Sequence, residues 1–218
     1  MPPFQPEIVW TVVVAGGTGA RFGAAKQYAL LDDLRMIDHS VAVAASVSDG
    51  VVVVVPAADV AHESTVFEHV VAGGASRSAS VRAGLAAVPD EATVICVHDA
   101  ARPFATEALF AAVVEVVHSG ADGAIPGVAV TDTIKVVDAD RAVVDTPPRD
   151  SLVAVQTPQA FRASVLRDAH RSGADGTDDA ALVEAAGGRV VVVPGEADNR
   201  KVTHPDDLEW ARSRVGAR

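Results

Sequence analysis

The apolar positions divide the chain into short strand-like runs and longer segments with helical spacing. Four valine-rich runs are too short for helices and lack the polar alternation of a half-exposed strand. Strands that are covered on both faces, as in a parallel sheet, have this pattern. The runs occupy residues 8–15, 50–56, 93–99 and 189–195.

Segments with helical spacing lie around and between these runs. They cover residues 36–48, 59–71, 78–88, 106–118, 160–171, 178–186 and 205–214. Gly120, Gly173 and Gly187 follow three of them, as expected where a helix ends in a left-handed residue. The alternation predicts a Rossmann-like α/β fold with a doubly wound, mostly parallel sheet. In such a fold ligands bind beyond the carboxyl ends of the strands.

Residues 128–156 do not follow this alternation of strands and helices. They have alternating apolar residues around an Asp-Ala-Asp turn and a Pro-Pro pair, which predicts an extended β-hairpin arm outside the main sheet. An apolar arm is poorly suited to stand alone in water, so we expect a homodimer. With no linker or internal repeat, we expect residues 1–218 to form a single domain that carries this arm.

The charge balance limits the kinds of partner. The chain has 218 residues, with 18 basic and 29 acidic side chains and a formal net charge of −11. Nucleic acids and membrane surfaces are bound by basic faces, so we expect neither as a partner. The N-terminus has no signal-like pattern and the chain has no apolar run of ~18 residues, which favours a cytoplasmic protein. Cys96 lies inside an apolar run, where it is expected to fill space.

The first candidate site follows the first strand, in "VVVAGGTGARFGAAKQY" at residues 12–28. Glycines at 16, 17 and 19 let backbone N–H groups approach an anion closely, and Arg21 and Lys26 follow. The motif is neither a P-loop nor G-x-G-x-x-G. The alternative is a plain strand-to-helix turn with two solvated cations.

The second candidate is "VHDAARP" at residues 97–103. Asp99 stands at the carboxyl end of a strand, where one carboxylate is well placed for a Mg²⁺ ion that also contacts phosphates. The alternative is an Asp99–Arg102 turn pair without a ligand. His98 is expected to be a packing histidine, because the sequence has no His/Cys cluster that would indicate zinc.

Two further segments combine small or basic residues with a helix start. "GGASRSASVRAGL" at 73–85 offers backbone amides and hydroxyls to a base edge or an anion, and the alternative is ordinary helix capping. "ADNRKVTHPDDL" at 197–208 places Lys201 just before a helix. Lysine occurs at only three positions, against 15 arginines. This bias indicates that lysine is kept where a compact charge is needed.

These segments, in this order, resemble the cytidylyltransferases that join CTP to a sugar-alcohol phosphate. The similarity covers about residues 9–212 and is greatest to the enzymes that act on 2-C-methyl-D-erythritol 4-phosphate in the non-mevalonate isoprenoid pathway. Its markers are "KQY" at 26–28, "GG" with "SRSASV" at 73–81, "VHDAARP" at 97–103, "DTIK" at 132–135, "QTPQAF" at 156–161, "TDDA" at 177–180 and "DNRKVT" at 198–203.

The resemblance implies a nucleotidyltransferase domain with Mg²⁺ as cofactor and CTP as the nucleotide substrate. Arg21, Lys26 and Lys201 match the catalytic cations that neutralise charge at the α-phosphorus. Asp99 matches the carboxylate on the Mg²⁺ side, and Gly74 and Ser80 match the pocket for the cytosine edge. The implied nucleotide-binding residues are Ala15, Gly16, Gly17, Thr18, Gly19, Gly74, Ser80, Asp99 and Ala100.

The acceptor side is implied in the same way. Thr133 and Arg149, on the predicted arm, match residues that hold the acceptor phosphate, and Arg102 matches an arginine that braces the loop after Asp99. In the family the arm reaches across a dimer to complete the partner's site. The acceptor phosphate is already an anionic nucleophile at neutral pH, so catalysis needs alignment and charge neutralisation rather than a general base. The absence of a Ser/His/Asp set agrees with this chemistry.

Departures from the family pattern leave other functions open. "AGG" at 15–17 looks like the form of ribitol-5-phosphate cytidylyltransferases, whereas "HDAARP" and "TDDA" favour the methylerythritol-phosphate enzymes. The segment between Arg21 and Lys26 is short, which also suggests a molybdopterin-type nucleotidyltransferase, although that reading does not account for the later motifs. A non-catalytic nucleotide sensor is the remaining alternative. The presence of Arg21, Lys26, Asp99 and Lys201 argues against it, because a sensor does not need every charge around the α-phosphorus.

Overall fold

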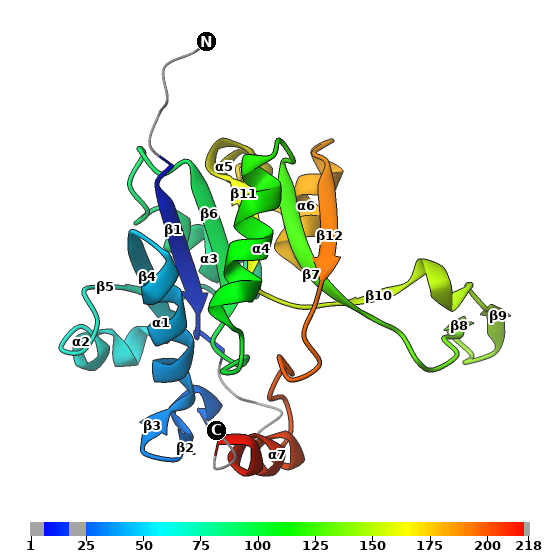
Figure 1. Cartoon of the computed structure of the whole chain (residues 1–218), viewed down its shortest axis with the longest axis horizontal. Helices are drawn as coiled ribbons and strands as arrows, with labels where there is room; N and C mark the ends of the chain where they lie inside the picture. The colour runs from blue at the N-terminus through cyan, green and yellow to red at the C-terminus, as the bar shows by residue number, and fades with distance from the viewer. Residues whose placement is uncertain (1–6, 18–24, 216–218) are drawn as a thin grey trace.

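The computed structural model describes residues 7–17 and 25–215. Within this part of the chain an eight-stranded sheet forms the centre of the fold (Figure 1). The strand order is β10-β7-β11-β6-β1-β4-β5, and β12 also pairs with β7, in parallel. The strands are β1 (Val9–Val14), β4 (Gly50–Val55), β5 (His69–Ala72), β6 (Val94–Asp99), β7 (Gly123–Ala129), β10 (Val153–Val155), β11 (Gln159–Arg162) and β12 (Val190–Pro194).

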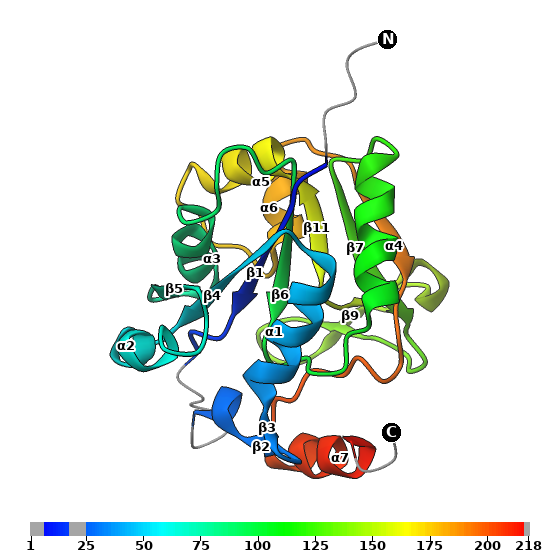
Figure 2. The same cartoon turned by 60° about the vertical axis from the view of Figure 1, so that its left-hand side comes forward.

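Among these strands only β10 and β11 run antiparallel to their neighbours. The mostly parallel, doubly wound sheet expected from the sequence is therefore confirmed. Helices α1 (Met36–Val47) and α4 (Glu107–His118) cover one face, and α3 (Arg77–Leu85), α5 (Ala163–His170) and α6 (Asp179–Ala185) cover the other (Figure 2).

The valine-rich runs are apolar at most positions because helices cover both faces of the sheet, and Thr11 and His98 are buried polar exceptions. Val12 and Val54 pack in the cluster on the α3 side, whereas Val13 and Val53 pack in the cluster on the α1 side. All four are buried. Successive side chains of a strand point to opposite faces, so a strand between two helical layers favours apolar residues on both faces.

Smaller elements lie around this core. Helix α7 packs against β2 beyond the carboxyl ends of the strands (Figure 1). The elements are β2 (Leu30–Leu31), β3 (Leu34–Arg35), α2 (Val60–Glu63), α7 (Pro205–Val215) and the 3₁₀ turns η1 (Lys26–Tyr28), η2 (Ala57–Asp59) and η3 (Arg149–Ser151). None of the described helices is long and apolar enough to cross a membrane.

Two of the predicted helices are wrong in part. The segment 59–71 is helical only in α2 and then continues through a turn into the edge strand β5. The segment 160–171 begins as β11, and its helix starts only at Ala163. Short strands such as "HVVA" and "QAFR" gain their stability from pairing with distant strands, which local spacing does not reveal.

The predicted arm is present. Strands β8 (Val136–Val137) and β9 (Val143–Asp145) form an antiparallel pair that projects away from the main sheet (Figure 1). At the Asp-Ala-Asp turn, Asp138 Oδ1 accepts hydrogen bonds from the backbone N–H groups of Asp140 (3.0 Å) and Ala142 (2.9 Å). Val143 and Val144 are 59% and 60% exposed. The arm therefore leaves apolar surface uncovered in the single chain.

Candidate active site

Two cavities meet at the carboxyl ends of the central strands. The larger has a volume of about 440 Å³ and the smaller about 340 Å³. Three of the described residues line both cavities, namely Arg77, Asp99 and Lys201. These three residues therefore form the wall between the two spaces, and a molecule in either cavity lies beside their charges.

The larger cavity contains most of the predicted nucleotide-binding residues. It lies where the loops after β1, β5 and β6 come together, which is the expected place in a doubly wound sheet. The predicted residues that line it are Ala15, Gly16, Gly17, Lys26, Gly74, Ser80, Asp99, Ala100 and Lys201. Thr18, Gly19 and Arg21 lie outside the described residues.

Close packing between the loops requires glycine at two positions beside this cavity. A Cβ on Gly73 would lie 2.9 Å from Ser80 Oγ, and a Cβ on Gly74 would lie 2.5 Å from the Cβ of Ala79. Both distances are shorter than ordinary van der Waals contact. The "GG" motif thus lets the loop after β5 lie against the start of α3.

Ser80 holds this loop in place. Its Oγ accepts a hydrogen bond from the backbone N–H of Gly74 (3.1 Å) and donates to the carbonyl of Ser76 (3.0 Å). Ser76 caps α3, because its Oγ accepts from the backbone N–H of Ala79 (3.1 Å). The capping alternative is therefore correct for Ser76, and Ser80 shapes the cavity wall through the backbone.

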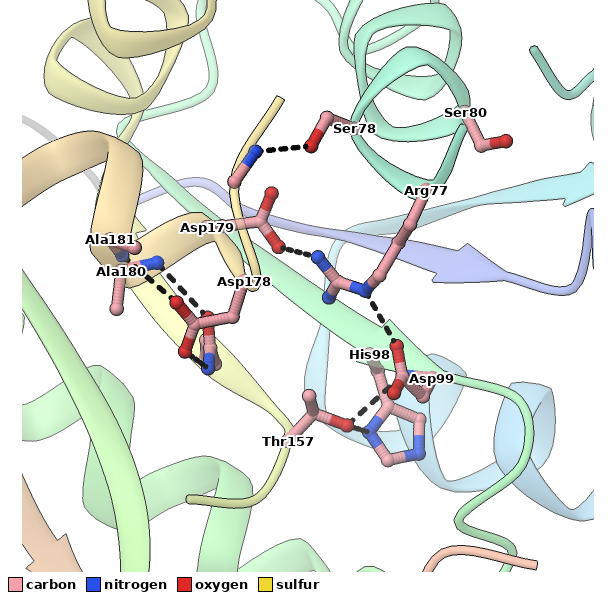
Figure 3. A network of polar contacts seen from close by, with 12 residues as sticks. Arg77, Ser78, Ser80, His98, Asp99, Thr157, Asp178, Asp179, Ala180 and Ala181 are labelled. Atoms are coloured by element: carbon pink, nitrogen blue, oxygen red, sulfur yellow. Dashed lines mark hydrogen bonds and ion pairs between the residues drawn. The ribbon is translucent and has the colours of Figure 1, made fainter. Parts of the chain in front are cut away.

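Asp99 is the centre of the charged wall. Its Oδ2 accepts a hydrogen bond from Lys201 Nζ at 2.6 Å. Its Oδ1 accepts from Arg77 Nε at 3.2 Å (Figure 3). Burial alone would raise the pKa of the Asp99 carboxyl, but the charges of Arg77 and Lys201 more than offset burial and hold this pKa well below its usual value. Asp99 is consequently ionised throughout the physiological range.

Arg77 is the residue of this wall that sequence reasoning missed. Its guanidinium also donates from Nη1 to Asp179 Oδ2 at 2.7 Å (Figure 3). Asp99 and Asp179 are far from Arg77 in the sequence, so no local spacing connects them. The local signal for Arg77 is its place between two serines in "SRSASV", at the start of a helix.

The two predicted lysines reach the larger cavity from different segments. Lys26, in η1, donates from Nζ to the carbonyl of Val202 at 2.7 Å. The backbone N–H of Val202 in turn donates to the carbonyl of Ala101 (2.8 Å). These bonds join the segment after the glycine-rich turn, the loop after Asp99 and the loop of Lys201 around one space.

Arg102 lines the smaller cavity and braces the loop that carries Lys201. Its Nη1 donates to the carbonyl of Asn199 (2.7 Å), and its Nη2 donates to the carbonyl of Val155 (3.2 Å). The backbone N–H of Arg102 donates to the Asp99 carbonyl (2.9 Å), so these residues form a turn, and the Arg102 guanidinium points to other partners. Asn199 is fully buried and donates to the carbonyl of Thr157 (2.9 Å), which anchors the loop on its other side.

His98 is a packing residue, as predicted. The Asp99 backbone N–H donates to Thr157 Oγ1 (3.0 Å), so the Thr157 hydroxyl is free to donate to His98 Nδ1 (3.1 Å). His98 Nε2 lies 3.2 Å from the Arg102 carbonyl, to which it donates in the neutral form. The ring is fully buried, and burial lowers its pKa from 6.5 to about 4.

This burial makes the stability of the fold depend on pH. Below pH 6.5 the unfolded chain protonates His98 while the folded chain does not, so stability is lost as pH falls toward the folded pKa of about 4. We expect His98 to account for about 2 kcal/mol of the stability lost between about pH 7 and about pH 5. Urea unfolding at both pH values checks this expectation. His98→Asn should show a smaller pH difference, and an equal difference in both proteins would contradict the assignment.

The two predicted acceptor residues on the arm lie elsewhere. Thr133 and Arg149 are exposed, and neither is among the described residues that line the two cavities. Arg149 Nη1 donates to the carbonyl of Thr131 (3.2 Å), which orders the base of the arm. The single chain thus brings the nucleotide-side residues together and leaves the acceptor-side arm residues apart.

The carboxylates of the site match only one type of metal site. Among the described residues there is no group of three or more His, Cys, Asp or Glu side chains that could hold an ion. Asp99 is the one carboxylate among the described residues that line the larger cavity. A single carboxylate fits Mg²⁺, which takes its remaining ligands from phosphate oxygens and water, and does not fit a closed zinc site.

Curated relatives with similar sequences carry two kinds of name. The chain is 45% identical over 216 residues to the 2-C-methyl-D-erythritol 4-phosphate cytidylyltransferase of Rhodococcus jostii, covering 95% of both chains. It is 41% identical to the bifunctional enzyme IspD/IspF of Oleidesulfovibrio alaskensis, covering 94% of this chain and 57% of the relative. The chain therefore spans little more than half of such bifunctional relatives.

Solved structures and the family model agree with these relatives. The fold matches the 4-diphosphocytidyl-2C-methyl-D-erythritol synthase of Anaerococcus prevotii with a TM-score of 0.86 and 26% identity, covering 96% of each chain. The 2-C-methyl-D-erythritol 4-phosphate cytidylyltransferase of Thermus thermophilus matches with a TM-score of 0.80 and 31% identity, covering 94% of this chain and 98% of that one. The model of the IspD family, 2-C-methyl-D-erythritol 4-phosphate cytidylyltransferase, matches residues 9–216. The chain belongs to the 2-C-methyl-D-erythritol 4-phosphate cytidylyltransferase family.

Proposed function

We propose that this chain transfers the cytidylyl group of CTP to 2-C-methyl-D-erythritol 4-phosphate. The products are 4-diphosphocytidyl-2-C-methyl-D-erythritol and pyrophosphate, in the non-mevalonate route to isoprenoid precursors. The observation that carries the proposal is the wall of Arg77, Asp99 and Lys201, which a nucleotide-sized cavity and a smaller cavity share. Family membership supports the identity of both substrates.

In this proposal CTP occupies the larger cavity. Its triphosphate lies against the backbone of Gly16 and Gly17, where the loop has no side chains that would keep the anion away. Lys26 and Lys201 neutralise the charge that builds up on the α-phosphate oxygens, and we propose Arg21 as a third cation on sequence grounds. These fixed charges stabilise the transition state without moving a proton.

The acceptor phosphate occupies the smaller cavity, beside Arg102. One of its oxygens attacks the α-phosphorus in line with the leaving group. A new P–O bond forms while the bond from the α-phosphorus to the bridging oxygen breaks, and the electron pair leaves with pyrophosphate. Lys201 lines both cavities, so it contacts the phosphorus on which the two substrates meet.

Asp99 is the residue that would hold Mg²⁺ in this site. The ion, when bound, supplies further positive charge to the triphosphate and its leaving group. Arg77 and Lys201 keep the Asp99 carboxyl ionised by lowering its pKa, so a proton does not compete for its oxygens. Lys201 is 40% exposed at its side chain, so it is free to leave Asp99 for a phosphate.

A second candidate acceptor is ribitol 5-phosphate, which "AGG" at residues 15–17 favours. Pyrophosphate release with CTP and Mg²⁺, measured in parallel with both polyol phosphates, separates the candidates. Release with methylerythritol phosphate alone supports the proposal. Release with ribitol phosphate alone would overturn the proposed acceptor but support cytidylyl transfer. No pyrophosphate release with either acceptor would overturn the proposed reaction.

We further propose that the chain acts as a homodimer through its arm. Ile134, Val136 and Val144 are exposed on the arm, and burying such a surface against a second copy is favourable. Thr133 and Arg149 would then complete the acceptor site of the partner. Light scattering at micromolar concentration should give the mass of a dimer, and the mass of a monomer would contradict this proposal.

The arm proposal makes a kinetic prediction for Arg149. Arg149→Ala should raise the KM for the polyol phosphate by roughly tenfold or more, because a charge-assisted contact to phosphate is lost. The CTP affinity should stay the same, since Arg149 does not line the larger cavity. Steady-state kinetics with each substrate varied in turn measures both effects. Arg171→Ala, at an exposed arginine, is the control and should change neither constant. Weaker CTP binding without a change in the KM for the polyol phosphate in Arg149→Ala would contradict the proposed role of the arm.

A further inference from the structure

Arg77 joins two carboxylates across the wall between the cavities. Its Nε donates to Asp99 Oδ1 at 3.2 Å and its Nη1 donates to Asp179 Oδ2 at 2.7 Å (Figure 3). Asp99 comes from the end of β6, and Asp179 comes from the first residue of α6. The guanidinium thus connects the carboxyl end of a central strand to a helix that begins beside the smaller cavity.

Asp179 is held from its other side as well. Its Oδ1 lies 3.0 Å from His170 Nε2, and both side chains are buried. His170 Nδ1 has no hydrogen-bond partner among the described residues, so Nε2 makes the contact of this ring with Asp179. The Asp179 carboxylate is fully buried and forms an ion pair with the Arg77 guanidinium at 2.7 Å. An uncompensated buried charge is costly, so Arg77 is strongly held at this position.

This anchoring matters for Asp99, because the two cations that pair with Asp99 differ in freedom. Lys201 is 40% exposed, whereas the side chain of Arg77 is 24% exposed and is fixed by fully buried Asp179. In the proposed reaction Lys201 serves the α-phosphate. Arg77 is then the cation that keeps the Asp99 carboxylate in place. The planar guanidinium serves both carboxylates at once, which the point charge of a lysine does not do.

We propose that Arg77, held by Asp179, is the positioning residue that fixes Asp99 on the wall between the two cavities. This inference rests on the proposed function. It assigns a kinetic role to the Arg77–Asp179 ion pair, which would otherwise be a structural contact only. Arg77 acts through Asp99 and Asp179 acts through Arg77.

The test compares Arg77→Ala, Arg77→Lys, Asp179→Asn and the double variant Arg77→Ala/Asp179→Asn. Arg77→Ala should lower kcat about 30-fold, with a CTP dissociation constant within about threefold of wild type, because Asp99 is needed in place mainly in the transition state. Asp179→Asn should lower kcat about tenfold. The double variant should match Arg77→Ala within about threefold, since two residues that act in series are not additive.

Three further measurements separate positioning from folding. Arg77→Lys should not recover kcat, and guanidinium added at low concentration should recover part of it in Arg77→Ala but not in Asp179→Asn. Arg82→Ala is the matched control, because Arg82 lies on the same helix and donates to the Ala174 carbonyl (2.8 Å). Asp179→Asn keeps the side-chain shape, so it gives the comparison with wild type if Arg77→Ala does not fold.

The outcomes distinguish the inference from the function on which it rests. A wild-type protein that releases no pyrophosphate would overturn the proposed reaction. An active wild type with unchanged kcat in Asp179→Asn, or with kcat restored in Arg77→Lys, would overturn the inference alone. Equal losses of kcat and CTP affinity in Arg77→Ala would show a structural role and would also overturn it.

Discussion

Replacing Lys201 by alanine should lower kcat on the order of 10³-fold and change CTP affinity by less than about threefold. The reason is the position of its ammonium group, 2.6 Å from Asp99 Oδ2 on the wall that both cavities share. In the ground state the Lys201 ammonium forms an ion pair with the Asp99 carboxylate. In the transition state it meets the charge that builds up on the α-phosphate, and only an interaction that strengthens there raises kcat.

Pre-steady-state and steady-state kinetics, together with calorimetric CTP binding, check this prediction. The neighbouring residue provides a matched control, because Arg200 stacks over the Trp210 ring at 4.4 Å and pairs with Asp207 at 3.5 Å. Arg200→Ala should keep kcat within about threefold of wild type. Lys201→Arg should recover little activity, since a planar fork does not replace a compact charge at a crowded site. A normal kcat in Lys201→Ala would remove this residue from the mechanism.

Asp99→Asn should lower kcat on the order of 10²-fold and raise the Mg²⁺ concentration needed for half-maximal activity. The substitution keeps the shape of the side chain and removes its charge from beside Arg77 and Lys201. Without Mg²⁺, CTP should bind this variant at least as tightly as it binds wild type, because one negative charge beside the triphosphate is gone. The direction of this second effect separates loss of a metal-side carboxylate from general damage to the cavity.

The measurements are a Mg²⁺ titration of turnover and CTP binding in the presence of a chelator. Asp49→Asn is the control with the same chemical change. Asp49 is exposed and accepts a hydrogen bond from the Val9 backbone N–H at the opposite end of β1. If Asp99→Asn binds CTP more weakly than wild type in the presence of the chelator and needs no more Mg²⁺ for turnover, Asp99 is not the metal-side carboxylate.

The part of the fold that could be predicted from the sequence is the part with a local signal. The side chains of the valine-rich runs alternate between two helical layers, so the runs are mostly apolar. Gly120, Gly173 and Gly187 have positive φ angles of 111°, 74° and 86°. By contrast, β11 lies between β6 and β7 and runs antiparallel to both. Its polar Gln159 and Arg162 give it no strand-like pattern, and only long-range pairing defines it.

The same distinction applies to the site. Glycine-rich turns and charges at the ends of strands are predictable, because parallel strands bring their carboxyl ends together. The link from Arg77 to Asp179 is not predictable in this way, since it joins residues from separate helices. Arg102 shows a further limit, because its backbone N–H donates to the Asp99 carbonyl, whereas its guanidinium donors reach the distant carbonyls of Asn199 and Val155.

The central claim is that the two substrates meet at the wall of Arg77, Asp99 and Lys201. A crystal structure of the protein with Mg²⁺, a non-hydrolysable CTP analogue and 2-C-methyl-D-erythritol 4-phosphate tests this claim most directly. We expect the α-phosphate within about 3 Å of Lys201 Nζ, which is hydrogen-bond distance, with the acceptor phosphate in the smaller cavity beside Arg102. A triphosphate that does not reach Lys201, or an acceptor bound away from the smaller cavity, would contradict the account.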